Sequence, residues 1–532
     1  MNGSAVPLAT DRAALLARLA EPRVFDVAVV GGGATGLGVA LDAATRGLSV
    51  VLLESHDFAK GTSSRSTKLL HGGVRYLAQG NLALVHEALN ERGVVLHNAP
   101  HLAQPLPFVV PSYGWRHALL YGLGLRLYDL LAGRAGLGKT EFLNPAQIRH
   151  CLPNIQTKGL KGGVRYWDAQ FDDARLAVAL ARTAASRGAL VLNYCAATGL
   201  IHEAGKVAGL SCLDVETGQS IEVRAGCVIN AAGVWVDELR RKDGLVTGRP
   251  VRPMVAPSQG VHVVVDRGFM PSDHALLVPH TADGRVLFAV PWLGKVILGT
   301  TDTPRRDLPR EPRPFKQEVD FILREISRYL CRAPTRADIK SVWVGLRPLV
   351  RAKGEDGAST QALSREHTVL VSRSGLVTVT GGKWTTYRAM AEDVLARCFK
   401  SGLLPTASGG VTADLTLIGG HAASRARYST IAGTPGLHLY GDEAAAVLAM
   451  AGANRELGGG LSEAMVRFAA RSEYARTVED VLARRSRLLF LDAKLAADLA
   501  GAVGEILLQE TGVDPQTEAF CELAADYLHL PG

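Results

Sequence analysis

The chain has 532 residues, of which 47% are hydrophobic and 21% charged, and its formal net charge is +8. This composition is typical of a globular protein, and the length allows two or three domains with a large core. The positive balance favours anionic partners, namely a phosphorylated substrate, an anionic membrane surface or nucleic acid. Because the sequence has no long Lys/Arg block and no nucleic-acid-binding motif, we expect no nucleic acid among its partners.

Seven cysteines are scattered along the sequence without a Cys-x-x-Cys pair. Their odd number and spacing indicate a reducing compartment and argue against a disulfide framework or a metal site. Charged residues interrupt the apolar positions near the N-terminus, which is unlike a signal peptide, so we expect residues 1–22 to form a short helical extension. No run of 18 or more apolar residues occurs, and we expect nothing that spans a bilayer.

The first predicted strand leads into a glycine-rich motif. Residues 26–30 run into Gly31-x-Gly33-x-x-Gly36, and a helical pattern follows. Gly31 permits a tight turn, Gly33 allows the backbone to approach phosphates, and Gly36 lets the helix pack against the strand. Glu54 ends the next strand, at the spacing of the acid that binds an adenosine ribose. The motif predicts a dinucleotide site at a helix N-terminus, without separating NAD from FAD.

Hydrophobic periodicity and turn residues predict the later elements. Helices are expected at 82–98, 115–134 and 171–187, strands at 48–53, 189–194, 207–212, 220–224, 227–233, 369–371 and 377–379, and a small-residue loop at 61–68. Prolines punctuate residues 100–111, residues 251–344 are mainly β, and a linker at 402–410 precedes a helical region to 528. The helix at 115–134 is either a core-facing helix with a solvated basic edge or a membrane-surface patch.

Two further glycine-rich segments bear on the cofactor. Ala231-Ala232-Gly233 ends a buried strand with small residues, and Gly381-Gly382-Lys383 precedes a helix that could face an anion. Strand–glycine–helix features near both ends of the chain indicate one cofactor domain assembled from separated segments. This pattern favours FAD, which is long and permanently held, over NAD.

Several stretches match a known family. They are residues 31–36, 62–64, 68–76, 172–176, 230–235, 299–302, 345–349 and 381–388. From about residue 24 onward the chain resembles the FAD-dependent glycerol-3-phosphate dehydrogenases of the respiratory, quinone-reducing type. The loop through residue 76 and the segment 381–388 are the specific parts of this resemblance. The sequence departs from the family pattern at Gln259 and Val261 (more usually Lys and Ser), at Ala232 (commonly Thr) and at Arg65.

The resemblance implies an α/β fold with an FAD-binding Rossmann-like domain of the D-amino-acid-oxidase/glutathione-reductase-2 type, a mainly β substrate domain and a helical C-terminal cap. The expected boundaries are 23–85, 165–245 and 345–402 for the FAD-binding domain, 86–164 and 246–344 for the substrate domain, and 411–532 for the cap. A homodimer is allowed.

The activity that the resemblance implies is oxidation of sn-glycerol 3-phosphate to dihydroxyacetone phosphate, with hydride transfer to flavin N5 and electrons passed to membrane quinone. The implied location is cytoplasmic, peripheral to the cytoplasmic face of the inner membrane, on an anionic membrane surface. Two alternatives stay open: an oxygen-using glycerol-3-phosphate oxidase or another flavin-dependent oxidase of this fold, and a non-catalytic flavin-binding protein.

Motifs and resemblance together assign the site residues. The expected cofactor-binding residues are Gly31, Gly33, Ala34, Thr35, Gly36, Glu54, Thr62, Ser63, Ser64, Lys68, Leu70, His71, Gly72, Ala232, Gly233, Gly382, Lys383 and Thr385. The expected substrate-binding residues are Arg75, Tyr76, Arg347 and Arg365, because the planar guanidinium fork of Arg binds two phosphate oxygens.

The residue that takes the C2 hydroxyl proton is left open among His262, His71 and Lys383. His262 enters an apolar strand, His71 lies in the loop expected against the flavin ring, and Lys383 stands at a helix start. A positioned base contributes about 10²- to 10⁴-fold in rate. Lys383 and Arg347 are also expected to stabilise charge that develops during the reaction.

Overall fold

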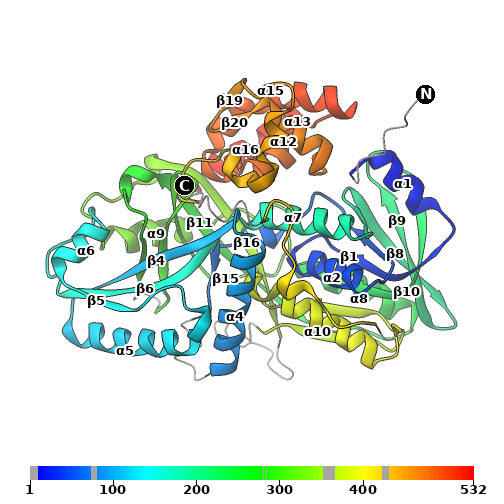
Figure 1. The fold of residues 1–532 in the computed structure, drawn as a ribbon, viewed down its shortest axis with the longest axis horizontal. Helices are drawn as coiled ribbons and strands as arrows, with labels where there is room; N and C mark the ends of the chain where they lie inside the picture. The colour runs from blue at the N-terminus through cyan, green and yellow to red at the C-terminus, as the bar shows by residue number, and fades with distance from the viewer. Residues whose placement is uncertain are drawn as a thin grey trace.

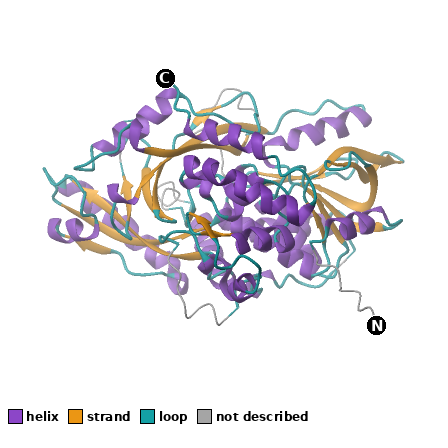
Figure 2. Ribbon diagram, turned by 90° about the horizontal axis from the view of Figure 1, so that it is seen from above, coloured by secondary structure: helices purple, strands orange, loops and turns teal. Residues whose placement is uncertain are grey.

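The computed structural model describes residues 10–73, 81–279, 281–282, 284–351, 366–405, 407–421 and 431–532. Two large sheets with their helices form the two halves of the elongated body, and a helical C-terminal part covers the region between them (Figure 1). Seen from above, the C-terminal helices lie over the middle of the molecule (Figure 2).

The first sheet carries the predicted dinucleotide fold. Its strand order is β17 (Thr368–Val371), β18 (Val377–Thr380), β10 (Ser220–Asn230), β1 (Val24–Val30), β2 (Val50–Leu53) and β7 (Leu190–Leu192), with β9 (Lys206–Asp214) and β8 (Cys195–Glu203) extending from β10. The strands from β18 to β7 are parallel. Because helices cover parallel sheets, such strands read as nearly continuous apolar runs, as β2 does.

Helices pack on this sheet in the way the sequence periodicity predicts. They are α1 (Arg12–Ala20), α2 (Ala34–Thr45), α7 (Asp173–Ser186), α8 (Val236–Val246) and α10 (Tyr387–Lys400), with short 3₁₀ turns η1 (Thr62–Ser64), η3 (Gly233–Trp235) and η6 (Trp384–Thr386). Helix α2 packs between α7 and α10. Because α2 follows β1 after a short turn, the N-terminus of α2 lies at the edge where the parallel strands end.

The second sheet has ten strands in the described residues. The order is β15 (Thr303–Pro304), β11 (Val255–Asp266), β14 (Lys295–Gly299), β13 (Leu287–Trp292), β12 (Ala275–Val278), β4 (Ala103–Ser112), β6 (Gly162–Phe171) and β3 (Leu69–Leu70), with β16 (Ile339–Val350) paired to β11 and β5 (Glu141–Leu143) paired to β6. Its helices and turns are α4 (Leu82–Asn98), α5 (Trp115–Ala132), η2 (Gly133–Ala135), α6 (Pro145–Cys151), η4 (Arg267–Phe269), α9 (Lys316–Ser327) and η5 (Arg336–Asp338).

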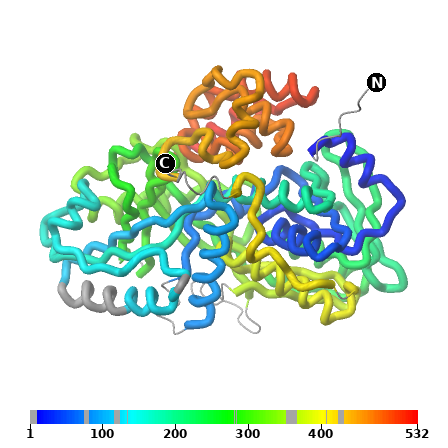
Figure 3. Tube along the Cα trace, in the orientation of Figure 1, coloured from blue at the N-terminus to red at the C-terminus, as the bar shows by residue number. Residues whose placement is uncertain are grey.

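The C-terminal part is helical, as predicted, and lies above the junction of the two halves (Figure 3). The preceding turn η7 (Thr412–Asp414) still packs against α2 and α4. The elements of the C-terminal part are η8 (Leu437–Glu443), α12 (Ala444–Leu448), β19 (Glu456–Gly458), β20 (Leu461–Ser462), α13 (Glu463–Ser472), η9 (Asp480–Arg485), α14 (Leu488–Leu491), α15 (Ala493–Thr511) and α16 (Thr517–Leu528). Its core includes Trp292 and Trp343 of the second sheet, so the helical part packs directly on that sheet.

One strand prediction differs from the structure, and one strand was not predicted. Residues 220–224 and 227–233 were expected as separate strands, but 220–230 form the single strand β10, which pairs with β9 at one end and with β1 along its length. Residues 103–112 form β4 despite three prolines at 105, 107 and 111. These prolines alternate with other residues, which keep their N–H groups for pairing with β6.

Strand pairing also moves the expected domain boundaries. Residues 165–171 and 345–350 were assigned to the FAD-binding domain, but they belong to β6 and β16 of the second sheet. Leu415 and Leu417, assigned to the cap, pack in the core of the first sheet. Pairing between distant segments decides these boundaries, and local composition does not report it. Among the described helices, none combines the length and apolar character needed to cross a membrane.

Candidate active site

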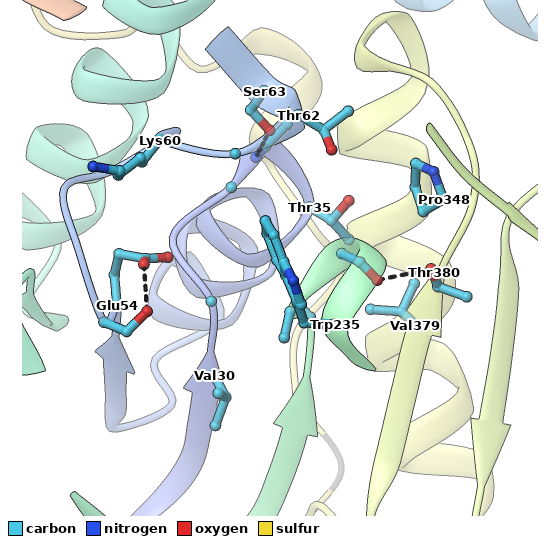
Figure 4. A pocket seen from close by; sticks show the side chains of 18 of the residues that line it. Val30, Thr35, Glu54, Lys60, Thr62, Ser63, Trp235, Pro348, Val379 and Thr380 are labelled. Atoms are coloured by element: carbon cyan, nitrogen blue, oxygen red, sulfur yellow. Dashed lines mark hydrogen bonds between the residues drawn. The ribbon is translucent and has the colours of Figure 1, made fainter. Parts of the chain in front are cut away.

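A cleft opens where the parallel strands of the first sheet end. Its walls come from the turn between β1 and α2, the end of β2, the loop around η1, the end of β10 and the segment after β18. Figure 4 shows Glu54 and Lys60 on one side of the opening, Val379 and Thr380 on the other, and the Trp235 ring standing between them. In open α/β sheets, ligands bind at this edge.

Most of the predicted cofactor positions meet in this cleft. Those that line it are Gly31, Gly33, Ala34, Thr35, Glu54, Thr62, Ser63, Ala232, Gly233, Gly382 and Lys383. Gly36, Ser64, Lys68, Leu70, His71, Gly72 and Thr385 are outside the set that lines it. The cleft also has walls that the sequence reasoning missed: His56, Lys60, Trp235, Arg310 and Pro348. His56 and Trp235 follow the predicted strands 48–53 and 227–233 by three and two residues, which is the signal that could have found them.

The glycine turn has the geometry that its sequence predicts. Gly31 has a φ of +108°, a conformation that side-chain-bearing residues rarely adopt. A Cβ at Gly36 would lie 1.9 Å from the Gly31 carbonyl oxygen, so only glycine allows α2 to approach the turn this closely. At Gly33 a Cβ would point toward the Ser63 hydroxyl at 3.1 Å. The turn is therefore a backbone cradle at a helix N-terminus, which suits a pyrophosphate.

Glu54 braces the cradle and keeps capacity for a ligand. Its carboxylate accepts hydrogen bonds from the Gly32 N–H at 2.7 Å, the His56 N–H at 2.9 Å and the Ser55 hydroxyl at 3.2 Å. A carboxylate has about four acceptor sites, so room remains for a ribose hydroxyl. Its negative charge would repel a 2′-phosphate.

The loop around η1 joins the cofactor turn to both sheets. The Ser63 hydroxyl accepts the Ala34 N–H at 3.0 Å, and the Ser63 carbonyl accepts the Trp384 indole N–H at 2.7 Å. The Thr62 hydroxyl donates to the Leu346 carbonyl at 2.6 Å. One short loop thus aligns the glycine turn, the second glycine segment and strand β16.

The Lys68 side chain lies inside the protein. Its ammonium donates to the Ser64 carbonyl at 2.6 Å and to the Asp173 carboxylate at 2.7 Å. The side chain is fully buried, and burial lowers the pKa of Lys68 to about 7 despite the neighbouring carboxylate. The Lys68 side chain thus links the loop around η1 to Asp173 inside the protein.

His262 lies on β11 and is 2% exposed. Its Nε2 is 2.9 Å from the Thr67 hydroxyl, and its ring stacks on Trp343 at a centroid distance of 4.1 Å. Its Nδ1 is buried and has no hydrogen-bond partner among the residues that the structure describes. Burial, helped by the positive charges of Lys68 and Arg347, lowers the pKa of His262 well below its usual range. The imidazole is therefore neutral near pH 7.

Arg347 lies on β16, which pairs with β11. Its terminal nitrogens donate to the Gln259 carbonyl at 3.3 Å, the Asp302 carboxylate at 3.2 Å, the Thr300 hydroxyl at 3.1 Å and the Thr301 carbonyl at 2.9 Å. A Cβ at Gly260 would lie 2.2 Å from one of these nitrogens, so the guanidinium covers the face of β11 at that position. Because residues two apart on a strand share a face, His262 and Arg347 are neighbours.

Gln259, one of the departures from the family pattern, is fully buried. Its amide donates to Glu318 at 2.5 Å and accepts from Arg305 at 2.6 Å. The Gln259 side chain therefore stabilises strand β11, and the backbone carbonyl of Gln259 is the group that accepts a hydrogen bond from Arg347.

The other predicted residues are less completely placed. Lys383 lines the cleft at the start of η6, and His71 follows β3. The Gly72 N–H donates to the Tyr128 hydroxyl at 2.8 Å, which anchors this loop. Arg75, Tyr76 and Arg365 lie outside the described residues. Within the described part of the chain, no group of three or more His, Cys, Asp or Glu residues could hold a metal ion.

Comparison with family models identifies the class of protein. A model described as FAD dependent oxidoreductase matches residues 26–388, and a model described as the C-terminal domain of alpha-glycerophosphate oxidase matches residues 410–518. The cleft agrees with the first match, because the glycine cradle and the partly free Glu54 carboxylate suit the phosphates and ribose of FAD. The fold and the cleft thus define a flavin-dependent oxidoreductase with FAD as its cofactor.

Individual relatives narrow the class. The chain is 40% identical to the mitochondrial glycerol-3-phosphate dehydrogenase of Arabidopsis thaliana, over 94% of this chain and 85% of the relative, and 41% identical to that of Homo sapiens, over 94% and 73%. The structure of the glycerol-3-phosphate dehydrogenase from Bacillus halodurans complexed with FAD superimposes with a TM-score of 0.78, at 29% identity and 98% coverage of both chains. The chain belongs to the family of FAD-dependent glycerol-3-phosphate dehydrogenases.

An oxidase shares the fold at lower similarity. The L-α-glycerophosphate oxidase of Mycoplasma pneumoniae with FAD bound has a TM-score of 0.55 at 17% identity, covering 73% of this chain and 97% of its own. This likeness concerns the fold alone.

Proposed function

We propose that the protein oxidises sn-glycerol 3-phosphate to dihydroxyacetone phosphate and passes the electrons to a membrane quinone. The observation that carries this proposal is that Arg347 lies beside His262 on one face of β11. A cation that can bind the substrate phosphate is thus next to a neutral imidazole that can serve as the base for the substrate hydroxyl. When bound, FAD accepts the hydride from C2 and later releases the electrons to a second acceptor.

Arg347 is the phosphate anchor in this proposal. The contacts to Asp302 and to the carbonyls of Gln259 and Thr301 hold its guanidinium in one orientation before substrate arrives. A pre-oriented fork loses little entropy on binding a phosphate. Hydrogen bonds to charged groups contribute about 1.5–3 kcal/mol each, so one or two dominate the affinity for a small substrate.

His262 takes the C2 hydroxyl proton. If Nε2 donates its proton to the Thr67 hydroxyl, the tautomer leaves the lone pair on Nδ1, which has no partner in the described part of the chain. Burial, together with the positive charges of Lys68 and Arg347, lowers the pKa of His262 and keeps the imidazole neutral until substrate enters. The dianionic phosphate of the substrate then brings negative charge next to the ring, which favours proton uptake.

Anaerobic flavin bleaching is the direct test. The wild-type protein with bound FAD is mixed with glycerol 3-phosphate without oxygen, and the loss of flavin absorbance is followed. Arg347→Ala should raise KM by on the order of 10²-fold through loss of its phosphate contacts, and His262→Ala should slow bleaching by about 10²- to 10⁴-fold. Arg313→Ala, an exposed arginine paired with Asp526, is the matched control. Unchanged bleaching in both site variants removes the proposed roles, and no bleaching of the wild type removes the substrate.

The electron acceptor is tested in the second half of the same experiment. The reduced protein is divided and exposed either to a soluble quinone or to oxygen. Fast reoxidation by quinone and slow reoxidation by oxygen support a dehydrogenase, whereas the reverse makes the protein an oxidase.

We also propose peripheral attachment to the anionic cytoplasmic face of the inner membrane. The described end of α5 presents Leu127 and Leu130, which are 43% and 77% exposed, beside Arg126, whose guanidinium lies over the half-exposed Phe142 ring. Exposed apolar side chains next to cations suit an anionic lipid surface. Leu130→Ser should weaken flotation with anionic vesicles. Leu245→Ser, at an 83% exposed position on α8, should leave it unchanged. Equal loss in both variants, or no flotation of the wild type at low salt, contradicts this assignment.

A further inference from the structure

The C-terminal helical part reaches the cofactor loop through one short segment. Residues 479–487 include η9, a turn of π-helix at Asp480–Arg485. They contact residues 57–68, which contain the cleft-lining Lys60, Thr62 and Ser63. Both ends of this loop segment are held by buried charges from the same nine residues.

At the first end, Asp57 is fully buried between two arginines. Its carboxylate accepts from the Nη2 of Arg485 at 2.9 Å and from the Nε of Arg484. Arg484 also pairs with Glu479 at 2.6 Å, and Glu479 in turn accepts from the Lys60 ammonium at 2.6 Å. The ion pairs thus link a cleft-lining lysine to the C-terminal part.

At the second end, Arg487 and Lys68 converge on the same acceptors. The Ser64 carbonyl accepts from Lys68 at 2.6 Å and from Arg487 at 2.9 Å. The Asp173 carboxylate accepts from Arg487 at 2.9 Å, from Lys68 at 2.7 Å and from the Ser66 hydroxyl at 2.7 Å. Lys68, Asp173 and Arg487 are all fully buried, so solvent does not weaken these pairs.

Strained backbone conformations occur on both sides of the contact between residues 479–487 and residues 57–68. Ala59, Lys68 and Arg487 are non-glycine residues with φ of +61°, +64° and +68°. Such conformations persist where the surroundings fix them, and they cluster at functional sites. A π-helical turn is rare and is also frequent at functional sites. A contact that served only to attach one domain to another would not need strained residues on both sides.

We propose that residues 479–487 are a positioning element of the active site, through which the C-terminal part holds the cofactor loop in its binding geometry. The loop transmits this position through Ser63, which meets the Ala34 N–H and the Trp384 indole. The Thr67 hydroxyl of the same loop also contacts His262 and so fixes the position of the imidazole. The importance of this second contact rests on the proposed function, in which His262 is the base. Arg487 acts through the loop, without contact to substrate.

The test compares three variants of the full-length protein. Arg487→Lys keeps the charge but loses the fork that joins Ser64 to Asp173, and Ser66→Ala removes one hydroxyl from Asp173 on the loop side. Arg182→Lys is the control, because Arg182 joins α7 to the C-terminal part through Glu443 without touching residues 57–68. Thermal unfolding midpoints show how much each variant is destabilised.

FAD affinity and the visible circular dichroism of the bound flavin are the readouts, and neither depends on the substrate. We expect Arg487→Lys to raise the Kd for FAD at least tenfold and to change the flavin spectrum, Ser66→Ala to do so by about threefold, and Arg182→Lys to leave both unchanged at a similar loss of Tm. Wild-type Kd and spectrum in Arg487→Lys and Ser66→Ala would overturn the proposal. Equal changes in Arg182→Lys would do the same, because the effect would then follow stability alone. If Arg487→Lys does not fold, Glu479→Gln replaces it and must show the same changes, because it removes the charge with which the same segment holds Lys60 of the loop.

Discussion

The contact between Gly36 and the glycine turn gives the sharpest prediction about cofactor binding. A Cβ added at Gly36 would lie 1.9 Å from the Gly31 carbonyl oxygen, about 1.5 Å short of ordinary contact. The neighbours are backbone atoms of the turn, which cannot rotate away as a side chain would. Overpacking in a rigid region costs about 1–3 kcal/mol, and the upper end applies here. If this cost falls on cofactor binding, Gly36→Ala raises the Kd for FAD on the order of 10²-fold.

Titration of FAD into the apoprotein, followed by quenching of flavin fluorescence, measures this change. Gly38→Ala is the matched control, because the added Cβ on the same helix would meet the ring of Tyr387 on α10 at 2.9 Å, away from the turn. We expect Gly38→Ala to lower the thermal midpoint with little change in FAD affinity. A wild-type Kd in Gly36→Ala would refute the argument that the close approach of α2 to the turn forms the cofactor cradle.

Three further predictions concern the substrate side, acid stability and the ribose contact. Gly260→Ala places a Cβ 2.2 Å from the Arg347 guanidinium and should raise KM for glycerol 3-phosphate at least tenfold at unchanged FAD affinity; a parallel loss of FAD would contradict this. Burial lowers the pKa of His101 to about 3, so the unfolded chain takes up this proton first and stability falls as pH drops below 6.5. Between pH 7 and 5 the loss is about 2 kcal/mol, and His101→Gln should remove it from the pH dependence of urea unfolding. Glu54→Gln replaces a charged acceptor at the ribose position and should weaken FAD binding about tenfold, without altering the bleaching rate of the loaded protein.

Local sequence predicted the elements whose signals are contiguous. Helix α4 begins and ends at the predicted residues 82 and 98, and the glycine turn has the conformation that its spacing requires. In both cases the pattern and the structure span the same few residues. Strand β4 was not predicted because its prolines obscure the period, and its partner residues on β6 lie 50 to 68 positions later in the chain.

The partners of Lys68 and Gln259 could not be read from the sequence. Lys68 was expected at the cofactor because residues 68–76 match the family, but its partner Asp173 is 105 residues away. Gln259 stood out as a departure beside His262, but its amide binds Glu318, 59 residues later in the chain. In each case a distant, buried charge determines where the side chain points. Local patterns report secondary structure and turns, whereas pairing of buried charges depends on the completed fold.

The contacts that Arg347 already makes within the protein reduce the net free energy that it can contribute to phosphate binding. Among the described residues, its two terminal nitrogens donate hydrogen bonds to Gln259, Asp302, Thr300 and Thr301 before any ligand binds. A phosphate that binds these nitrogens replaces at least one acceptor, so binding is an exchange whose net gain is smaller than the contacts suggest. The Gln259 carbonyl, at 3.3 Å, is the weakest partner and the first that a phosphate would displace. The Asp302 carboxylate remains and keeps the fork aimed, but its charge opposes the incoming anion. Under the proposed function, the site would therefore combine a well-oriented anchor with moderate affinity, which suits an enzyme that must release a phosphorylated product.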